Sequence, residues 1–166
     1  MRTISKEELK ELYDKDFPLW AEINLELLKE RLYELVDWEN LLEEIEDMAR
    51  SDLKTCISYL AVILEHLYKR DNFRHLTKGG EEKGGLGWIK SIELARGELE
   101  ALIDIFPSLR SKVPQNLHVA WRMAIPKIIH SVEDLGIRIS KKDIPQECPY
   151  TYEEAMQRDL REEIKP

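Results

Sequence analysis

Residues 38–70 decide the fold, and they read WENLLEEIEDMARSDLKTCISYLAVILEHLYKR. Apolar side chains recur along this stretch in steps of three and four, and the stretch contains neither Gly nor Pro. This spacing places them on one side of an α-helix. The sequence therefore predicts one long central helix, about 38–70, with Asp37 as its N-cap. A helix of this length is the element against which shorter helices would pack.

Shorter helices are predicted on both sides of the long one, and together they indicate an all-α helical bundle. Ser5 and Glu8 match a capping box that starts a helix ending near Tyr13, and Asp16 can cap a second helix. The elements predicted after the long helix are a Gly-rich loop over 71–87, a helix over 88–106, an element over 109–134 that Pro114 and Pro126 break or kink, an irregular Pro-rich segment over 144–150, and a short final helix capped by Thr151.

Length and composition predict one globular domain over residues 1–166, because 166 residues with 43% hydrophobic content suit a single core. The longest unbroken apolar run has six residues, 59–64, whereas a membrane span needs about 20. The first residues also lack the apolar stretch of a signal peptide, so we expect a cytoplasmic protein without a membrane partner. Few Gln and Asn beside many Glu, Lys and Ile are typical of heat-loving organisms.

The negative charge of the chain is concentrated at one end. The formal net charge is -8, and residues 1–50 hold 15 acidic and 7 basic side chains, which accounts for all of it. Residues 51–166 hold 18 of each kind. Nucleic acid surfaces require clustered Lys and Arg, so this distribution argues against a nucleic acid partner for the N-terminal third.

Short motifs are spread over residues 13–151 of the chain. They are Tyr13-Asp14-x-Asp16-Phe17-x-x-Trp20, Asp37-x-x-Asn40-Leu41-x-Glu43-Glu44-Ile45-Glu46, His66-Leu67-x-Lys69, Trp88-x-x-x-Ile92, Arg96, Pro107-Ser108-Leu109 and Pro145-x-x-Cys148-Pro149-Tyr150-Thr151. In this order they resemble the bacterial family known as domain of unknown function 29. The resemblance implies an all-helical fold and no assigned activity. The Gly-rich insertion between Lys69 and Trp88, together with Pro114 and Pro126, departs from the family's pattern.

Two sets of polar residues border the apolar sides of the predicted helices. Asp52, Tyr59 and His66 recur every seven residues, but each step is about 10.5 Å along a helix, so they cannot form one catalytic site by themselves. We interpret them as residues that bond to neighbouring helices. Glu44 and Arg96 also flank apolar rows, and we expect an ion pair between them that fixes the register of two helices.

No catalytic group, metal site or cofactor is predicted. A di-metal site in a helical bundle uses Glu-x-x-His pairs, but the residues three before the four histidines are Ile63, Asn72, Gln115 and Lys127. Cys56 and Cys148 lie too far apart in sequence for a zinc motif, and they form no disulfide framework. A cation site built from Glu43, Glu44 and Asp47 is a minor alternative.

Two functions fit these observations. The preferred one is a non-enzymatic scaffold or adaptor that binds another protein or a second copy of itself through its acidic helix or a leftover apolar face. Its candidate structural or interaction residues are Asp37, Glu44, Asp52, His66 and Arg96. The alternative is an RNA-binding or HEPN-like ribonuclease bundle that uses the basic segment 69–78. There Arg70 would hold phosphate and His75 would act as acid or base.

Overall fold

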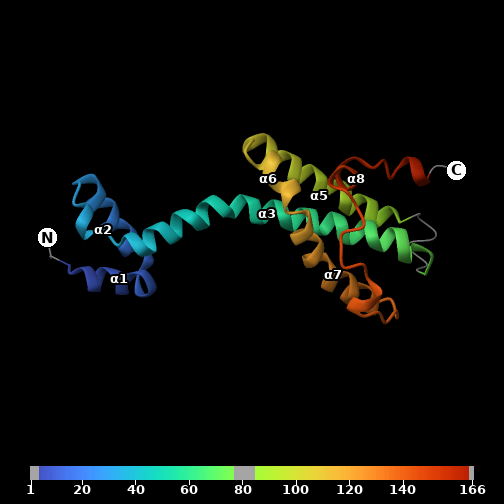
Figure 1. The fold of residues 1–166 in the computed structure, drawn as a ribbon, viewed down its shortest axis with the longest axis horizontal. Helices are drawn as coiled ribbons and strands as arrows, with labels where there is room; N and C mark the ends of the chain where they lie inside the picture. Colours follow the sequence, from blue (N-terminus) through green and yellow to red (C-terminus); the bar gives the residue numbers. More distant parts are fainter. Residues whose placement is uncertain (1–3, 77–84, 165–166) are drawn as a thin grey trace. The chain divides into compact units, whose positions relative to one another are not determined.

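The computed structural model describes residues 4–76 and 85–164 (Figure 1). All regular secondary structure in these residues is helical, which confirms the all-α class. None of the described helices is long and apolar enough to cross a membrane. The chain divides into two compact units, unit 1 with residues 1–51 and unit 2 with residues 52–166. The boundary between the units falls inside the long helix, and a single domain over residues 1–166 stays a prediction.

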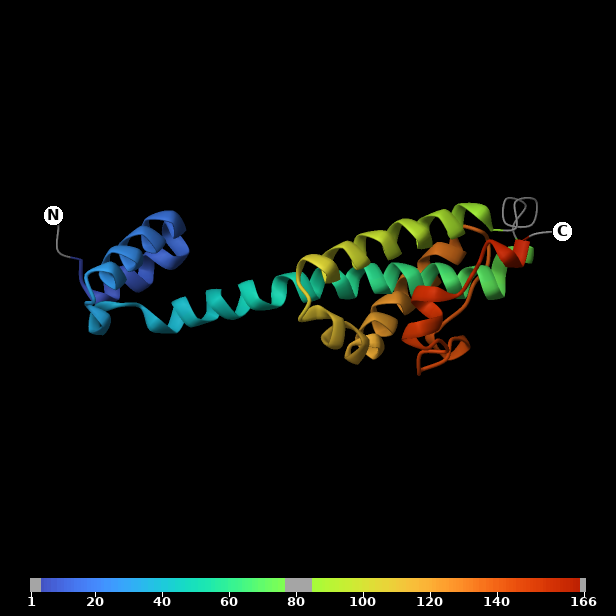
Figure 2. The same ribbon diagram turned by 90° about the horizontal axis from the view of Figure 1, so that it is seen from above.

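Unit 1 begins with two short helices that lie side by side, α1 (Lys6–Lys15) and α2 (Phe17–Lys29) (Figure 2). The predicted capping box starts α1, since Glu8 donates its backbone N–H to Ser5 Oγ at 3.1 Å. Asp16 caps α2, as predicted, by accepting from Leu19 N at 3.2 Å. A 3-10 turn, η1 (Tyr33–Leu35), leads into the long helix. Among the described residues of unit 1, the buried apolar ones are Leu9, Trp20 and Val36.

The long helix is α3 (Trp38–Phe73), which confirms the predicted central helix and extends it by three residues. The loop expected over 71–87 is therefore shorter than predicted. Residues 71–73 still belong to α3, a 3-10 turn η2 (Arg74–Leu76) follows, and the next helix already begins at Leu86. Residues 77–84 lie outside the described part of the chain.

Unit 2 packs three helices and a C-terminal segment on the second part of α3. They are α5 (Leu86–Ile105), α6 (Leu109–Gln115), α7 (Leu117–Glu133) and the short α8 (Tyr152–Gln157), with 3-10 turns η3 (Lys141–Asp143) and η4 (Glu162–Ile164). α5 runs alongside α3 in both views (Figures 1 and 2). The fully buried core residues include Leu60, Ile63, Leu64, Leu67, Ile89, Ile92, Leu99, Val113 and Ile128.

The two prolines behave differently from each other. The expected break follows Pro114, since α6 ends at Gln115 and α7 starts after Asn116. α7 continues through Pro126, so the helix is not broken there, and the other expectation, a kink at Pro126, stays a prediction. Pro126 has no N–H, so the carbonyl of Arg122, four residues earlier, has no helical hydrogen bond from it. Because Arg122 is exposed, water can donate to this carbonyl instead. The irregular segment over 144–150 is confirmed, and Trp121 Nε1 donates to the Pro145 carbonyl at 3.0 Å.

Candidate functional site

The start of α3 is fixed by hydrogen bonds around Asp37, which is fully buried. Asp37 Oδ2 accepts from Trp20 Nε1 at 2.9 Å and from Asn40 Nδ2 at 2.7 Å. The Asp37 backbone N–H donates to Asn24 Oδ1 at 2.9 Å. Because Trp20 and Asn24 belong to α2, these bonds determine which side of α3 faces α2. Asp37 thus precedes the first residue of α3, as predicted, and also attaches α2 to it.

Helix α1 is attached to the same part of α3 by polar contacts. Lys10 Nζ lies 3.0 Å from Glu39 Oε2, and the Tyr13 hydroxyl donates a hydrogen bond to the Glu44 carboxylate. The bond to Glu44 raises the pKa of Tyr13 to about 12. The Tyr13 ring also packs edge-on against Trp20 at 5.0 Å between centroids. In unit 1, therefore, one side of α3 is covered by α1 and α2.

Another side of α3 in unit 1 carries large apolar side chains that are exposed. We call Trp38, Leu42, Ile45 and Met48 the apolar stripe; their exposed fractions are 41, 55, 51 and 72%. Since they are three or four residues apart, they lie on one broad side of the helix. A contiguous exposed row of this kind marks an interaction site more often than singly scattered apolar residues do.

The part of α3 that carries the apolar stripe is rich in acidic residues. Residues 38–51 of α3 contain one basic residue, Arg50, and five acidic residues, which are Glu39, Glu43, Glu44, Glu46 and Asp47. All of these acidic residues except Glu44 are exposed. At about 100° per residue, Glu39 and Glu46 lie beside the apolar stripe, whereas Glu43 and Asp47 lie on the opposite side of the helix.

The second part of α3 carries its charges inside unit 2. The Lys69 side chain, 6% exposed, donates to Ser131 Oγ on α7 at 3.0 Å and lies 3.6 Å from Glu65 Oε2. Its ammonium also lies 5.6 Å from the centroid of the Trp88 ring on α5. Burial lowers the pKa of Lys69, although the Glu65 charge opposes this effect. This arrangement joins three helices through one buried cation.

His66 lies beside this buried cation. Its Nε2 is 3.3 Å from Glu65 Oε2, and its buried Nδ1 has no hydrogen-bond partner within the described residues. Burial, together with the cations of Lys69 and Lys127, lowers the pKa of His66 to about 4. His66 is therefore a neutral, half-buried residue at pH 7, with one nitrogen near a carboxylate.

The C-terminal end of α3 is attached to the C-terminal segment by ion pairs. The Arg70 side chain is 1% exposed, and its Nη1 lies 2.8 Å from Glu163 Oε2. Arg158 holds both carboxylate oxygens of Asp71, at 2.7 and 2.9 Å, and Tyr150 donates to the same group at 2.7 Å. Burial would raise the pKa of Asp71, but the bonds from Arg158 and Tyr150 outweigh it and lower that pKa.

The basic segment does not form a surface cluster in the described residues. Lys69 and Arg70 are buried, whereas His75 lies in η2 and is exposed. Lys78 lies outside the described residues. Arg70 thus directs Nη1 to a carboxylate inside unit 2, while the imidazole predicted to act with it is on the surface.

The remaining sequence candidates lie apart from one another. Arg96 donates to the carbonyls of Ala155 at 2.8 Å and Arg158 at 3.0 Å, so it holds the end of α8. Glu44 and Arg96 belong to different units, and the ion pair expected between them stays a prediction. Asp52 is half-buried. The pKa of the Cys56 thiol is raised mainly by the burial of Cys56 and, to a smaller extent, by the negative charge of Asp52.

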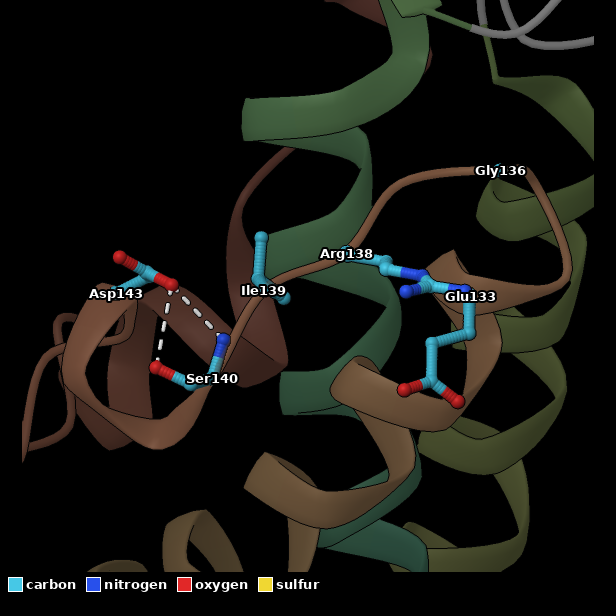
Figure 3. Close-up of a pocket in the computed structure, with 6 residues that line it drawn as sticks. All are labelled: Glu133, Gly136, Arg138, Ile139, Ser140 and Asp143. Atoms are coloured by element: carbon cyan, nitrogen blue, oxygen red, sulfur yellow. Dashed lines mark hydrogen bonds between the residues drawn. The ribbon is translucent and has the colours of Figure 1, made fainter.

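Surface hollows occur in both units. A hollow of about 410 Å³ in unit 1 is lined by Ile4, Glu8, Glu11, Leu12, Lys15, Leu19 and Ile23. A hollow of about 820 Å³ in unit 2 is lined by Glu133, Gly136, Arg138, Ile139, Ser140 and Asp143 (Figure 3). In the latter, Ser140 N donates to Asp143 Oδ2 at 2.8 Å, so these groups satisfy each other. No cluster of three His, Cys, Asp or Glu residues suited to a metal ion occurs in the parts described.

A model of the family described as domain of unknown function DUF29 matches residues 12–160. The chain belongs to the DUF29 family. This confirms the resemblance that the motifs over residues 13–151 indicated. No curated protein matches the chain, and no solved structure matches it. The family description assigns no activity, so the function of this DUF29 chain must be argued from its own surfaces.

Sequence reasoning missed the buried charges of this DUF29 chain, although a signal for them was present. Arg70 continues the row that runs through Ile63 and Leu67 in steps of four and three, so its position predicts burial. Burial of a guanidinium in turn predicts a carboxylate partner. The partner itself, Glu163, lies 93 residues away, and its identity has no local signature.

Proposed function

We propose that this DUF29 chain is a non-enzymatic adaptor that binds another protein through the apolar stripe of α3. The observation that carries the proposal is the exposure of Leu42 and Ile45, which leave more than half of their surface uncovered. Uncovering such side chains in water costs about 25 cal/mol for each Å² of apolar area, and a partner that covers them recovers this free energy. We expect this binding to take place in the cytoplasm, which is the location predicted from the sequence.

The polar clusters of unit 2 support a structural role instead. Lys69, Arg70 and Arg96 each reach across to another helix or to the C-terminal segment, and each bonds to a named group there. A buried group that only joins elements fixes their register and needs no substrate. These residues would hold the bundle in shape while unit 1 binds the partner.

The test compares two double variants with the unaltered chain. Leu42→Asp/Ile45→Asp places charges in the stripe, and Leu94→Asp/Ile105→Asp does the same at two exposed positions of α5. Proteins retained from a cell extract are quantified by mass spectrometry, and each retained protein is then purified and titrated calorimetrically. We expect at least a tenfold loss of affinity for the stripe variant and none for the α5 variant. Equal binding by both variants would overturn the proposal.

The ribonuclease alternative is the weaker proposal. Its phosphate-binding residue would be Arg70, but that side chain is 1% exposed and paired with Glu163, so a phosphate would have to displace a carboxylate inside unit 2. Only His75 of the proposed pair is on the surface. Degradation of RNA by the purified chain, abolished by His75→Ala, would favour this alternative over the adaptor.

A further inference from the structure

Arg70 uses only one side of its guanidinium to join α3 to the C-terminal segment. Its Nη1 lies 2.8 Å from Glu163 Oε2 and 3.8 Å from Asp71 Oδ1. Its Nε and Nη2 are buried and have no hydrogen-bond partner within the described residues. A buried N–H without an acceptor costs about 1–3 kcal/mol, and more when the group is charged. Two such nitrogens on one cation therefore point to an acceptor other than the two carboxylates.

The two unpaired nitrogens lie on the same edge of the guanidinium. Nε and Nη2 of an arginine donate side by side, so together they form a fork that fits two oxygens of one anion. Forks of this kind bind carboxylates and phosphates more strongly than single neutral hydrogen bonds do. We call Nε and Nη2 of Arg70 the free edge.

The free edge lies against the start of α5. Both views show the end of α3 near this start (Figures 1 and 2). A Cβ atom added to Gly85, the N-cap of α5, would lie 3.2 Å from Arg70 Cγ and 3.6 Å from its Nε. The backbone of Gly85 thus comes close to the guanidinium with no side chain between them.

The start of α5 offers further donors. The N–H groups of residues 86–88 have no acceptor inside the helix, as at the start of every α-helix. Gly85 supplies no side-chain cap, and the first turn of α5 contains no acidic residue. The dipole of this 20-residue helix gives its start a positive charge of about half a unit. A guanidinium beside a positive helix start is unfavourable unless an anion lies between them.

The neighbouring carboxylates do not supply this anion, because they are already balanced. Arg158 Nη1 lies 2.7 Å from Asp71 Oδ2, and Arg158 Nη2 lies 2.9 Å from Glu163 Oε1. Two arginines and two carboxylates therefore sum to zero charge before the positive start of α5 is counted. Both carboxylates approach Arg70 at Nη1 and not at the free edge.

We propose that the free edge of Arg70 and the first N–H groups of α5 bind a phosphate ion. The fork takes two of its oxygens and the helix start takes a third, so a phosphate fits better than a carboxylate, which has only two. The nitrogens are covered, so the ion enters when the surrounding segments open locally, and it is then enclosed, which strengthens its hydrogen bonds.

This site is separate from both functions discussed above. In the ribonuclease alternative a phosphate displaces Glu163 and brings an RNA chain into unit 2, whereas here Glu163 stays on Nη1 and only a small ion enters. The inference also goes beyond the adaptor function and does not rest on it, because the apolar stripe belongs to unit 1.

The experiment titrates the full chain with inorganic phosphate in a calorimeter at pH 7, with sodium chloride adjusted to keep the ionic strength constant. Arg70→Lys keeps the positive charge but lacks the fork. Gly87→Pro removes the N–H of the second residue of α5, a place that Pro18 takes in α2. Gly87→Ala keeps this N–H and is the matched control, because a Cβ atom on Gly87 meets nothing within 4 Å.

We expect the unaltered chain to bind phosphate, Arg70→Lys to lose at least tenfold in affinity, and Gly87→Pro to lose about fivefold, as for one hydrogen bond. Gly87→Ala and Leu42→Asp/Ile45→Asp should bind phosphate like the unaltered chain. Circular dichroism checks that each variant is folded, and Gly87→Pro with its control still tests the site where Arg70→Lys does not fold.

Three results would overturn the phosphate site. The first is no binding of phosphate by the unaltered chain. The second is a folded Arg70→Lys or Gly87→Pro variant with unchanged affinity. The third is displacement of phosphate by a short RNA with a 5′-hydroxyl, which would assign the free edge to RNA and favour the ribonuclease alternative.

Discussion

The two parts of α3 are one continuous helix with opposite arrangements of charge and apolar surface. In unit 1 the carboxylates and the apolar stripe both face solvent. In unit 2 the apolar side of the helix is covered, and Glu65, Lys69 and Arg70 are buried with it. The two parts differ in composition, since residues 38–51 contain six charged residues and residues 55–64 contain none. They also differ in the number of described elements that pack on each part.

This comparison separates two uses of the same periodic pattern. Where α5, α7 and the C-terminal segment surround the helix, apolar residues form a core and charges must find partners inside it. Where α1 and α2 are the described helices that contact it, one side of the helix is exposed. A pattern of steps of three and four therefore predicts a helix, and the elements packed around it decide which positions are core.

The largest difference in the free energy of unfolding is expected between two Leu→Ala variants, one in each part of α3. Leu60 is fully buried, and Leu60→Ala should lower the free energy of unfolding by about 2–5 kcal/mol, because the cavity cannot close completely. Leu42→Ala, at a side chain that is 55% exposed, should change it by less than about 0.5 kcal/mol. Urea unfolding followed by circular dichroism measures both. Equal losses for the two variants would contradict the contrast between the two parts.

A second comparison uses two aspartates of unit 1. Asp37→Ala should lower the free energy of unfolding by about 2–3 kcal/mol, because the variant loses the N-cap and leaves the buried Trp20 N–H without its acceptor. Asp47→Ala, at an exposed position of the same helix, should have an effect within about 0.5 kcal/mol. Thermal unfolding of the two variants side by side distinguishes them. A stable Asp37→Ala protein would show that α2 is attached to α3 by other contacts.

The smallest effect concerns the pH dependence contributed by His66. Its pKa is lowered from 6.5 to about 4, so between these values the unfolded chain binds a proton that the folded chain does not. This contribution to stability is complete above pH 6.5 and decreases by about 1.4 kcal/mol per pH unit as the pH falls towards 4. Glu65, Lys69 and Lys127 all face this imidazole.

Unfolding in urea at pH 7.0, 6.0 and 5.0 measures this slope. His66→Gln should lose less stability than the unaltered chain over this interval, and His118→Gln, at an exposed histidine, should behave like the unaltered chain. Identical slopes in all three proteins would mean that His66 is protonated equally in the folded and unfolded states.

Helix positions could be predicted from the sequence because their signals are local. The capping boxes at Ser5 and Thr151 each lie within four residues, and both are present in the structure. The break between α6 and α7 follows Pro114, but α7 tolerates Pro126, because the cost of a proline depends on whether water reaches the unpaired carbonyl. That accessibility depends on packing and has no sequence signature.

The contacts between distant elements could not be predicted in the same way. Arg96 bonds to backbone carbonyls at the end of α8, and no such bond was part of the sequence prediction. Every residue carries the same backbone C=O group, so the sequence around the acceptor gives no signal for such a bond. The exposure of Leu42 could not be read from the sequence either, because it reflects the absence of a covering element.

The ion pair between Arg70 and Glu163 has a consequence for the synthesis of the chain. The polar contacts of unit 1 join residues at most 31 positions apart, so they can form while the ribosome is still translating α3. Arg70 must wait for a residue 93 positions later, which takes roughly 5–20 s at ordinary translation rates. During that interval the bond from Arg70 to Glu163 is missing, although Asp71 Oδ1, 3.8 Å from the same nitrogen in the finished protein, is already present, and unit 1 is the first part of the nascent protein to be finished.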